Sequence, residues 1–175
     1  MKKVIGIVLV QLAALLGGGG AVAATTGGAG AAVNQRFFLA GPAEGPSITI
    51  TGHGVITGIG TLTAESVDLR PIDNTYHEVD RAVVGGGTLT ISIDGRFSTW
   101  PFTLDPRSCT RHGTLGGNWV ITGSGGVLTG TTGSGTFRGR FFTYAGRTPA
   151  GCDESAIRGF VAGPMIGHVR RPLPA

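Results

Sequence analysis

Hydrophobic and polar residues alternate over much of this chain with a period of two, which is typical of half-buried β-strands. The alternation is clearest in residues 116–142, where Trp119 and Ile121 are separated by other side chains and glycines bound the run. Glycine adopts positive φ without steric cost, so we place a turn at residues 123–126. The stretch therefore predicts a β-meander with glycine turns.

The second half of this meander also predicts which side chains share a face. Phe137, Phe141 and Thr143 fall on one face of an extended chain, whereas Arg138 and Arg140 fall on the other. The arginine pair has two interpretations. On an outward face both are ordinary solvated side chains; on an inward face two guanidinium groups would hold a carboxylate or a phosphate.

Shorter alternating runs predict further strands in the segments 47–51, 55–64, 75–79, 88–93, 96–104 and 156–169. Asp94-Gly95 lies between two such runs and predicts a tight hairpin turn. Gly163-Pro164 makes the last segment either a strand pair or one broken strand. About eight short strands with no helix beyond the N-terminal segment predict an all-β domain, either an antiparallel barrel or a sandwich.

The first 24 residues have the pattern of a secretory signal peptide. Two lysines precede an apolar run at residues 4–16, and Ala21-Val22-Ala23 supplies the small residues of a cleavage site. The apolar run is too short to cross a bilayer. We therefore expect an exported protein without a membrane span. Its parts would be a flexible lead-in, a barrel domain and a tail, at residues 25–46, 47–169 and 170–175.

Charge and cysteine content narrow the classes of function. Without residues 1–24 the chain has 12 arginines and no lysine against 10 acidic residues, a net charge of +2. No basic face interleaved with aromatics is present, so we expect no nucleic-acid partner. Without lysine, Schiff-base and P-loop chemistry are excluded. Two cysteines in an exported chain predict a Cys109–Cys152 disulfide.

Several glycine-rich motifs give the chain a family resemblance. They are Asp105-Pro106-Arg107-Ser108-Cys109, Trp119-Val120-Ile121-Thr122-Gly123, Gly133-Ser134-Gly135-Thr136-Phe137 and Gly151-Cys152-Asp153. With these motifs, residues 47–169 resemble small secreted bacterial proteins that are compared with the allene oxide cyclase and dirigent barrels. The resemblance implies a single antiparallel β-barrel of about eight strands. It transfers no catalytic residue, because no motif of the plant cyclases matches position by position.

Residues 65–82 carry the densest group of charges, and Pro71 predicts a loop there that either caps the barrel or hangs free. His77, Glu78 and Asp80 have three interpretations. They are solvated loop residues, ligands of a metal ion, or part of a site at the barrel mouth. In the last case His77 acts as an acid or base, and a nearby arginine, Arg81 or Arg70, binds an anion.

The aromatic residues also have two interpretations. Trp100, Phe102, Trp119, Phe137 and Phe141 are most simply core, but in a barrel with an open lumen they would form the wall of an apolar pocket. We assign no catalytic residue, metal ligand or cofactor. The candidate ligand-binding residues are His77, Asp80, Arg81, Trp100, Trp119, Arg138 and Arg140.

Three functions are consistent with these observations. The first is non-catalytic binding of an apolar small molecule or a cell-envelope component. The second is an enzyme that steers cyclisation or isomerisation of an apolar substrate in the lumen by shape and a few polar groups. The third is a protein-interaction or inhibitor domain that uses an outer face. The first two functions differ in one structural feature. An ionisable side chain that points into a cavity would favour the enzyme over the non-catalytic binding protein.

Overall fold

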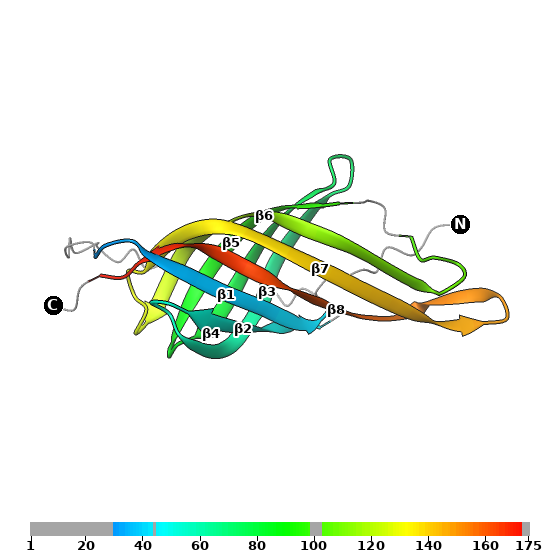
Figure 1. Cartoon of the computed structure of the whole chain (residues 1–175), viewed down its shortest axis with the longest axis horizontal. Helices are drawn as coiled ribbons and strands as arrows, with labels where there is room; N and C mark the ends of the chain where they lie inside the picture. Colours follow the sequence, from blue (N-terminus) through cyan, green and yellow to red (C-terminus); the bar gives the residue numbers. More distant parts are fainter. Residues whose placement is uncertain (1–29, 44, 99–102, 173–175) are drawn as a thin grey trace.

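The computed structural model describes residues 30–43, 45–98 and 103–172. Eight β-strands, each antiparallel to the next in sequence, form a closed barrel that is completed by pairing of the last strand with the first (Figure 1). The described residues contain no helix. The strands are β1 (Val33–Pro42), β2 (Ser47–His53), β3 (Gly58–Arg70), β4 (Thr75–Val84), β5 (Gly87–Phe97), β6 (Thr110–Gly126), β7 (Thr132–Thr148) and β8 (Gly151–Arg170). The expected eight-stranded barrel is confirmed.

One half of the barrel interior is filled by large side chains. Trp119 is 1% exposed, its indole N–H donates to the carbonyl oxygen of Thr136 at 3.1 Å, and its ring meets the edge of Phe37. Gln35 points inward and exchanges two hydrogen bonds of 2.9 Å with the backbone of Ile56. Ile56 and Leu128, both in connections between strands, are each 1% exposed. This end of the barrel is therefore closed by packed side chains.

The first strand corrects the expected domain boundary. Residues 33–42 are β1, not part of a flexible lead-in at residues 25–46, and β1 pairs with both β2 and β8. Gln35, Phe37 and Leu39 point inward, so residues 33–42 do alternate between an inner and an outer face. The glycines and prolines that follow this run made the strand hard to predict. At the other end, β8 includes Arg170, so the tail expected at residues 170–175 begins one residue later.

The hairpin turn expected at Asp94-Gly95 is wrong. Both residues lie inside β5, opposite His77 and Tyr76 of β4. Glycine is needed at position 95 because a Cβ atom there would lie 2.3 Å from Cζ of Tyr76. The β4–β5 turn is instead made by Gly85-Gly86, both with positive φ.

Replacing Gly95 with alanine is expected to destabilise the barrel by about 1–3 kcal/mol, because the added methyl group overlaps the buried ring of Tyr76. Urea unfolding followed by circular dichroism measures the loss. Gly146→Ala is the matched control, since a Cβ atom at position 146 meets nothing closer than 4.0 Å. Equal stability of the two variants would contradict the close approach of Tyr76.

The turn expected at residues 123–126 is also wrong, because β6 continues through Gly126 and the turn lies at residues 127–131. Gly123 and Gly125 pair with Thr90 and Thr88 of β5, whose side chains occupy the space above them. β8 likewise runs unbroken through Gly163-Pro164. In both places glycine serves close packing between strands.

The charge-dense segment is mostly strand. β3 extends to Arg70 and β4 begins at Thr75, so only residues 71–74 form a loop in place of the long loop expected over 65–82. Asn74 has φ of 56°, which asparagine tolerates better than most residues. A bulge between Ala64 and Ser66 shifts the register of β3 against β4.

The predicted disulfide is present. Cys109, just before β6, is bonded to Cys152 near the start of β8, across 43 residues. The bond joins the β5–β6 connection to the long β7–β8 hairpin, which projects beyond the other strands in Figure 1.

Cys152→Ser is expected to lower the free energy of unfolding by about 4 kcal/mol, because the bond restricts a loop of this length in the unfolded chain. Urea unfolding of the variant and of the dithiothreitol-reduced wild type should give the same loss. A loss below about 1 kcal/mol in both would contradict a stabilising role for the bond.

Candidate functional site

The other half of the barrel interior is hollow. It contains a cavity of about 190 Å³ at the end where the β1–β2 connection lies, since Pro42, Ala43 and Pro46 line it. Its wall is mainly apolar and comes from all eight strands. The larger apolar side chains of the wall are Leu39, Ile48, Leu62, Val67, Leu69, Ile93, Phe97, Leu115, Phe137, Phe141 and Val161.

Strand alternation explains why charged residues enter this apolar space. Tyr76, Glu78 and Asp80 are two residues apart on β4, so all three point inward together with Ala82. Asp80 is 2% exposed, and its strand neighbours are Ala64 on β3 and Ile91 on β5. The acidic pair therefore lies in a wall of aliphatic residues.

This environment keeps a proton on the pair. Burial, the charge of Glu78 and a hydrogen bond to Glu78 raise the pKa of Asp80 to about 9. Burial also raises the pKa of Glu78, although the hydrogen bond from Asp80 opposes this. The two carboxyl groups therefore share at least one proton at neutral pH, and the pair carries one negative charge at most.

A cation faces the same cavity from β6, which β5 separates from β4. Arg111 of β6 and Thr143 of β7 are register partners, and both are buried. The Nε–H of Arg111 donates to the hydroxyl oxygen of Thr143 at 2.7 Å. Both residues belong to the cavity wall, so Thr143 orients a buried guanidinium group beside the apolar space.

Tyr76 completes the polar groups. Burial, followed by the charges of Glu78 and Asp80, raises the pKa of Tyr76 well above 10, so the phenol stays protonated. Its ring lies 4.7 Å from that of Phe97 and meets the edge of Phe137 at 6.5 Å, measured between ring centroids. The phenol is therefore held in one position in the wall.

The structure separates the residues that the sequence proposed for a site. Of the candidates within the described residues, Asp80 alone lines the cavity. Trp119 lies in the packed half of the barrel, and Trp100 lies outside the described residues. His77 and Arg81 point outward from β4, and His77 Nδ1 lies 2.8 Å from Oδ1 of Asp94 on the surface. Arg138 and Arg140 also point outward, so neither can hold a ligand in the lumen.

Alternation also separates the three residues considered for a metal ion. His77 is on the outer face of β4, whereas Glu78 and Asp80 are on the inner face. Within the described parts of the chain, no three His, Cys, Asp or Glu side chains meet as a set of metal ligands.

Sequence reasoning missed most of the cavity's polar residues. Glu78 was considered as a loop residue, a metal ligand or part of a mouth site but was not among the candidate ligand-binding residues, and neither were Tyr76, Arg111 and Thr143. The one available signal was the phase of β4: Ala82 and Val84 continue the series of Glu78 and Asp80 at every second position. Arg111 had no such signal, because its inward neighbour in β6 is Gly113.

A scan against protein-family models, a search of curated proteins and a search of solved structures each found no match. No helix long and apolar enough to cross a membrane occurs in the part of the chain that the structure describes.

Proposed function

We propose that this is an exported β-barrel protein that binds a small, uncharged, mainly apolar molecule in its lumen. The observation that supports this most is the apolar cavity with a proton-sharing carboxyl pair and a buried arginine in its wall. Small-molecule sites have this character: an apolar lining with a few polar groups that fix orientation. The disulfide and the N-terminal sequence pattern are compatible with export.

Volume limits the ligand. The cavity of about 190 Å³ is below the range of about 300–1,000 Å³ for drug-sized ligands. It is close to the 150 Å³ of an engineered apolar cavity that binds benzene. A compound with a single ring, or one end of a longer molecule, fits this space.

Charge limits the ligand further. Arg111 supplies one positive charge, and the Glu78–Asp80 pair supplies one negative charge at most. When the pair carries that negative charge it balances Arg111, and a charged ligand would then add an uncompensated charge in an apolar space, which is unfavourable. The phenol O–H of Tyr76 is a donor in the cavity wall, so a neutral ligand with a carbonyl or ether oxygen is favoured.

Isothermal titration calorimetry with a pair of similar shape tests this proposal. Acetophenone carries the acceptor, and α-methylstyrene replaces the carbonyl oxygen with a methylene group. We expect both to bind, and the ketone to bind up to about tenfold more tightly, which corresponds to one hydrogen bond.

Two alanine-to-leucine variants locate the binding. Ala64→Leu places a larger side chain in the cavity and should abolish binding of both compounds. Ala156→Leu, on the exposed outer face of β8, should leave binding unchanged. If neither compound binds to the wild type, or if Ala64→Leu binds as the wild type does, the lumen is not the site.

The shared proton favours a second candidate function, an isomerase that transfers protons within a bound ligand. The ionised carboxylate of the pair would remove a proton from carbon next to a carbonyl group, whose oxygen accepts a proton from the protonated partner. The carboxyl group that took the proton then returns one to carbon, and the enol O–H gives its proton back to the partner carboxylate, which re-forms the carbonyl group and restores the pair. The raised pKa of Asp80 would favour this chemistry, because it keeps a proton donor available at neutral pH.

Deuterium exchange tests the second function. Acetophenone incubated with the protein in D₂O should gain deuterium at its methyl group, detected by ¹H NMR, and Asp80→Asn should lose this activity. Binding by calorimetry without exchange above the buffer rate would leave a binding protein and exclude proton transfer on this ketone.

A further inference from the structure

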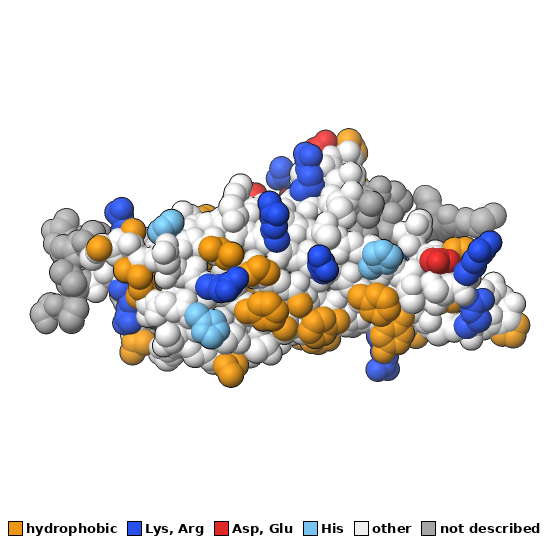
Figure 2. Space-filling model, in the orientation of Figure 1, with side chains coloured by type: hydrophobic (Ala, Val, Ile, Leu, Met, Phe, Trp, Pro, Cys, Tyr) orange, Lys and Arg blue, Asp and Glu red, His pale blue; other side chains and the backbone are white. Residues whose placement is uncertain are grey.

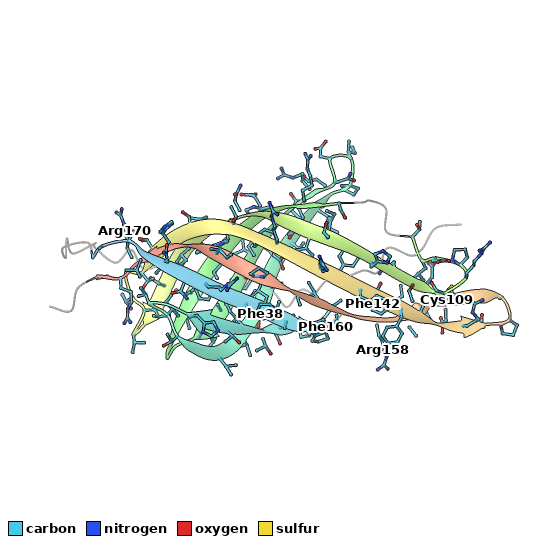
Figure 3. All side chains as sticks on the ribbon, in the orientation of Figure 1. Phe38, Cys109, Phe142, Arg158, Phe160 and Arg170 are labelled. Atoms are coloured by element: carbon cyan, nitrogen blue, oxygen red, sulfur yellow. A yellow bond between two sulfur atoms is a disulfide. The ribbon has the colours of Figure 1, made fainter. Side chains whose placement is uncertain are left out.

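The outer face of β1, β7 and β8 carries a row of exposed apolar side chains. Figure 2 shows hydrophobic side chains gathered along this face, and Figure 3 shows Phe38, Phe160 and Phe142 following one another along it. Each of the row's members is 45–51% exposed. We call the set the apolar stripe: Phe38, Phe142, Tyr144, Phe160 and Ile166.

The stripe is continuous across the three strands. Phe142 of β7 is paired with Phe160 of β8, and Phe38 of β1 is paired with Pro164 of β8. Phe142 and Tyr144 lie 6.3 Å apart between ring centroids. Adjacent outward side chains on paired strands touch, so these residues form one surface and not scattered exposed groups.

Arginines border the stripe. Arg158 is paired with Tyr144, Arg140 with Ala162, and Arg36 with Ile166, so each lies beside the row. Arg170 stands at the far end of β8 (Figure 3). No Asp or Glu occurs within β1 or β7, and the two in β8, Asp153 and Glu154, lie at its hairpin end. The face is therefore apolar along its middle and positive at its border.

A groove of about 620 Å³ adjoins this border. Arg96 of β5 and Arg138 of β7 are both register partners of Gly116 of β6, so the glycine leaves an open floor between two guanidinium groups. Arg140 and the hydroxyl groups of Ser98 and Thr114 also line the groove. No Asp or Glu is among the described residues that line it, so the charges in the groove are all positive.

We propose that this face docks on an anionic lipid surface. Aromatic side chains enter the boundary between headgroups and acyl chains, and arginines beside them bind lipid phosphates. Charge complementarity favours this partner over a second copy bound through the same face, because such a contact would oppose two sets of arginines. The proposal is independent of a ligand in the lumen.

Vesicle co-sedimentation of the full chain tests the proposal. We expect binding to vesicles of equal parts phosphatidylcholine and phosphatidylglycerol, at least tenfold weaker binding to pure phosphatidylcholine, and release as NaCl is raised from 50 to 500 mM. Phe142→Ser/Phe160→Ser and Arg138→Gln/Arg140→Gln should each weaken binding to the mixed vesicles at least tenfold. Free inorganic phosphate at the same ionic strength should not compete.

Control variants carry single changes of the same kind, apolar to serine and arginine to glutamine, on strands outside this face. Ile59→Ser replaces an apolar residue of β3 that is 77% exposed, and Arg81→Gln replaces an outward arginine of β4. Both should bind vesicles as the wild type does. Equal binding to the two vesicle types, or equal loss in the test and control variants, would overturn the proposal. Self-association that is lost in Phe142→Ser/Phe160→Ser would assign the stripe to a second copy instead.

Discussion

The stability of the barrel should fall as pH rises from about 5 to 8, and Asp80→Asn should remove most of this fall. The pKa of Asp80 is raised to about 9 in the folded chain, against about 4 in the unfolded chain. Between these values the folded state holds a proton that the unfolded state has lost. Each retained proton lowers the free energy of unfolding by about 1.4 kcal/mol per pH unit, or about 4 kcal/mol over three units.

Urea unfolding at pH 5, 6, 7 and 8 measures this effect. Asparagine has the shape of a protonated aspartic acid but does not ionise. The free energy of unfolding of the variant should therefore rise relative to that of the wild type at each increase in pH. Asp68→Asn on the exposed face of β3 is the control and should follow the wild-type slope. Parallel slopes for wild type and Asp80→Asn would mean that Asp80 is ionised in the folded protein.

Trp119→Ala should have a comparably large effect, a loss of about 3–5 kcal/mol in the free energy of unfolding. The substitution removes the largest buried side chain in the packed half of the barrel, its edge contact with Phe37 and its hydrogen bond to Thr136. Urea unfolding followed by circular dichroism measures the loss.

Trp119→Phe separates a core residue from a ligand-binding one. It keeps an aromatic ring, so most of the fold's stability should remain, and it lies outside the cavity wall. Its affinity for acetophenone should therefore equal that of the wild type. A change of tenfold or more in affinity would show that Trp119 contributes to ligand binding.

The sequence predicted the class of fold well, because alternation and glycine-rich breaks are local signals. The faces of β7 follow directly from alternation, and Phe137 and Phe141 are inside as expected. Turn positions were harder, since glycine has two uses in a barrel. Gly85-Gly86 makes a turn with positive φ, whereas Gly95 gives space to a ring on the neighbouring strand. Only the partner strand distinguishes the two uses.

The cavity was less predictable than the fold. Arg111 and Asp80 are 31 positions apart and lie on different strands, so their common cavity depends on barrel closure and on the register of all strands between them. Grouping His77, Glu78 and Asp80 in one site because they are close in sequence was also misleading. In a strand, direct neighbours point to opposite faces.

Closure by β8 has a consequence for how the barrel folds. β1 reaches its second partner only when Gly151–Arg170 is present, because β8 pairs with both β1 and β7. Until then β1 and β7 expose unpaired backbone edges, which are templates for aggregation. The contact that closes the barrel also has the longest sequence separation, a feature of slow folding. A newly synthesised chain must therefore avoid association with other chains until β8 is available. Truncation within β8 would leave the edges of β1 and β7 unpaired.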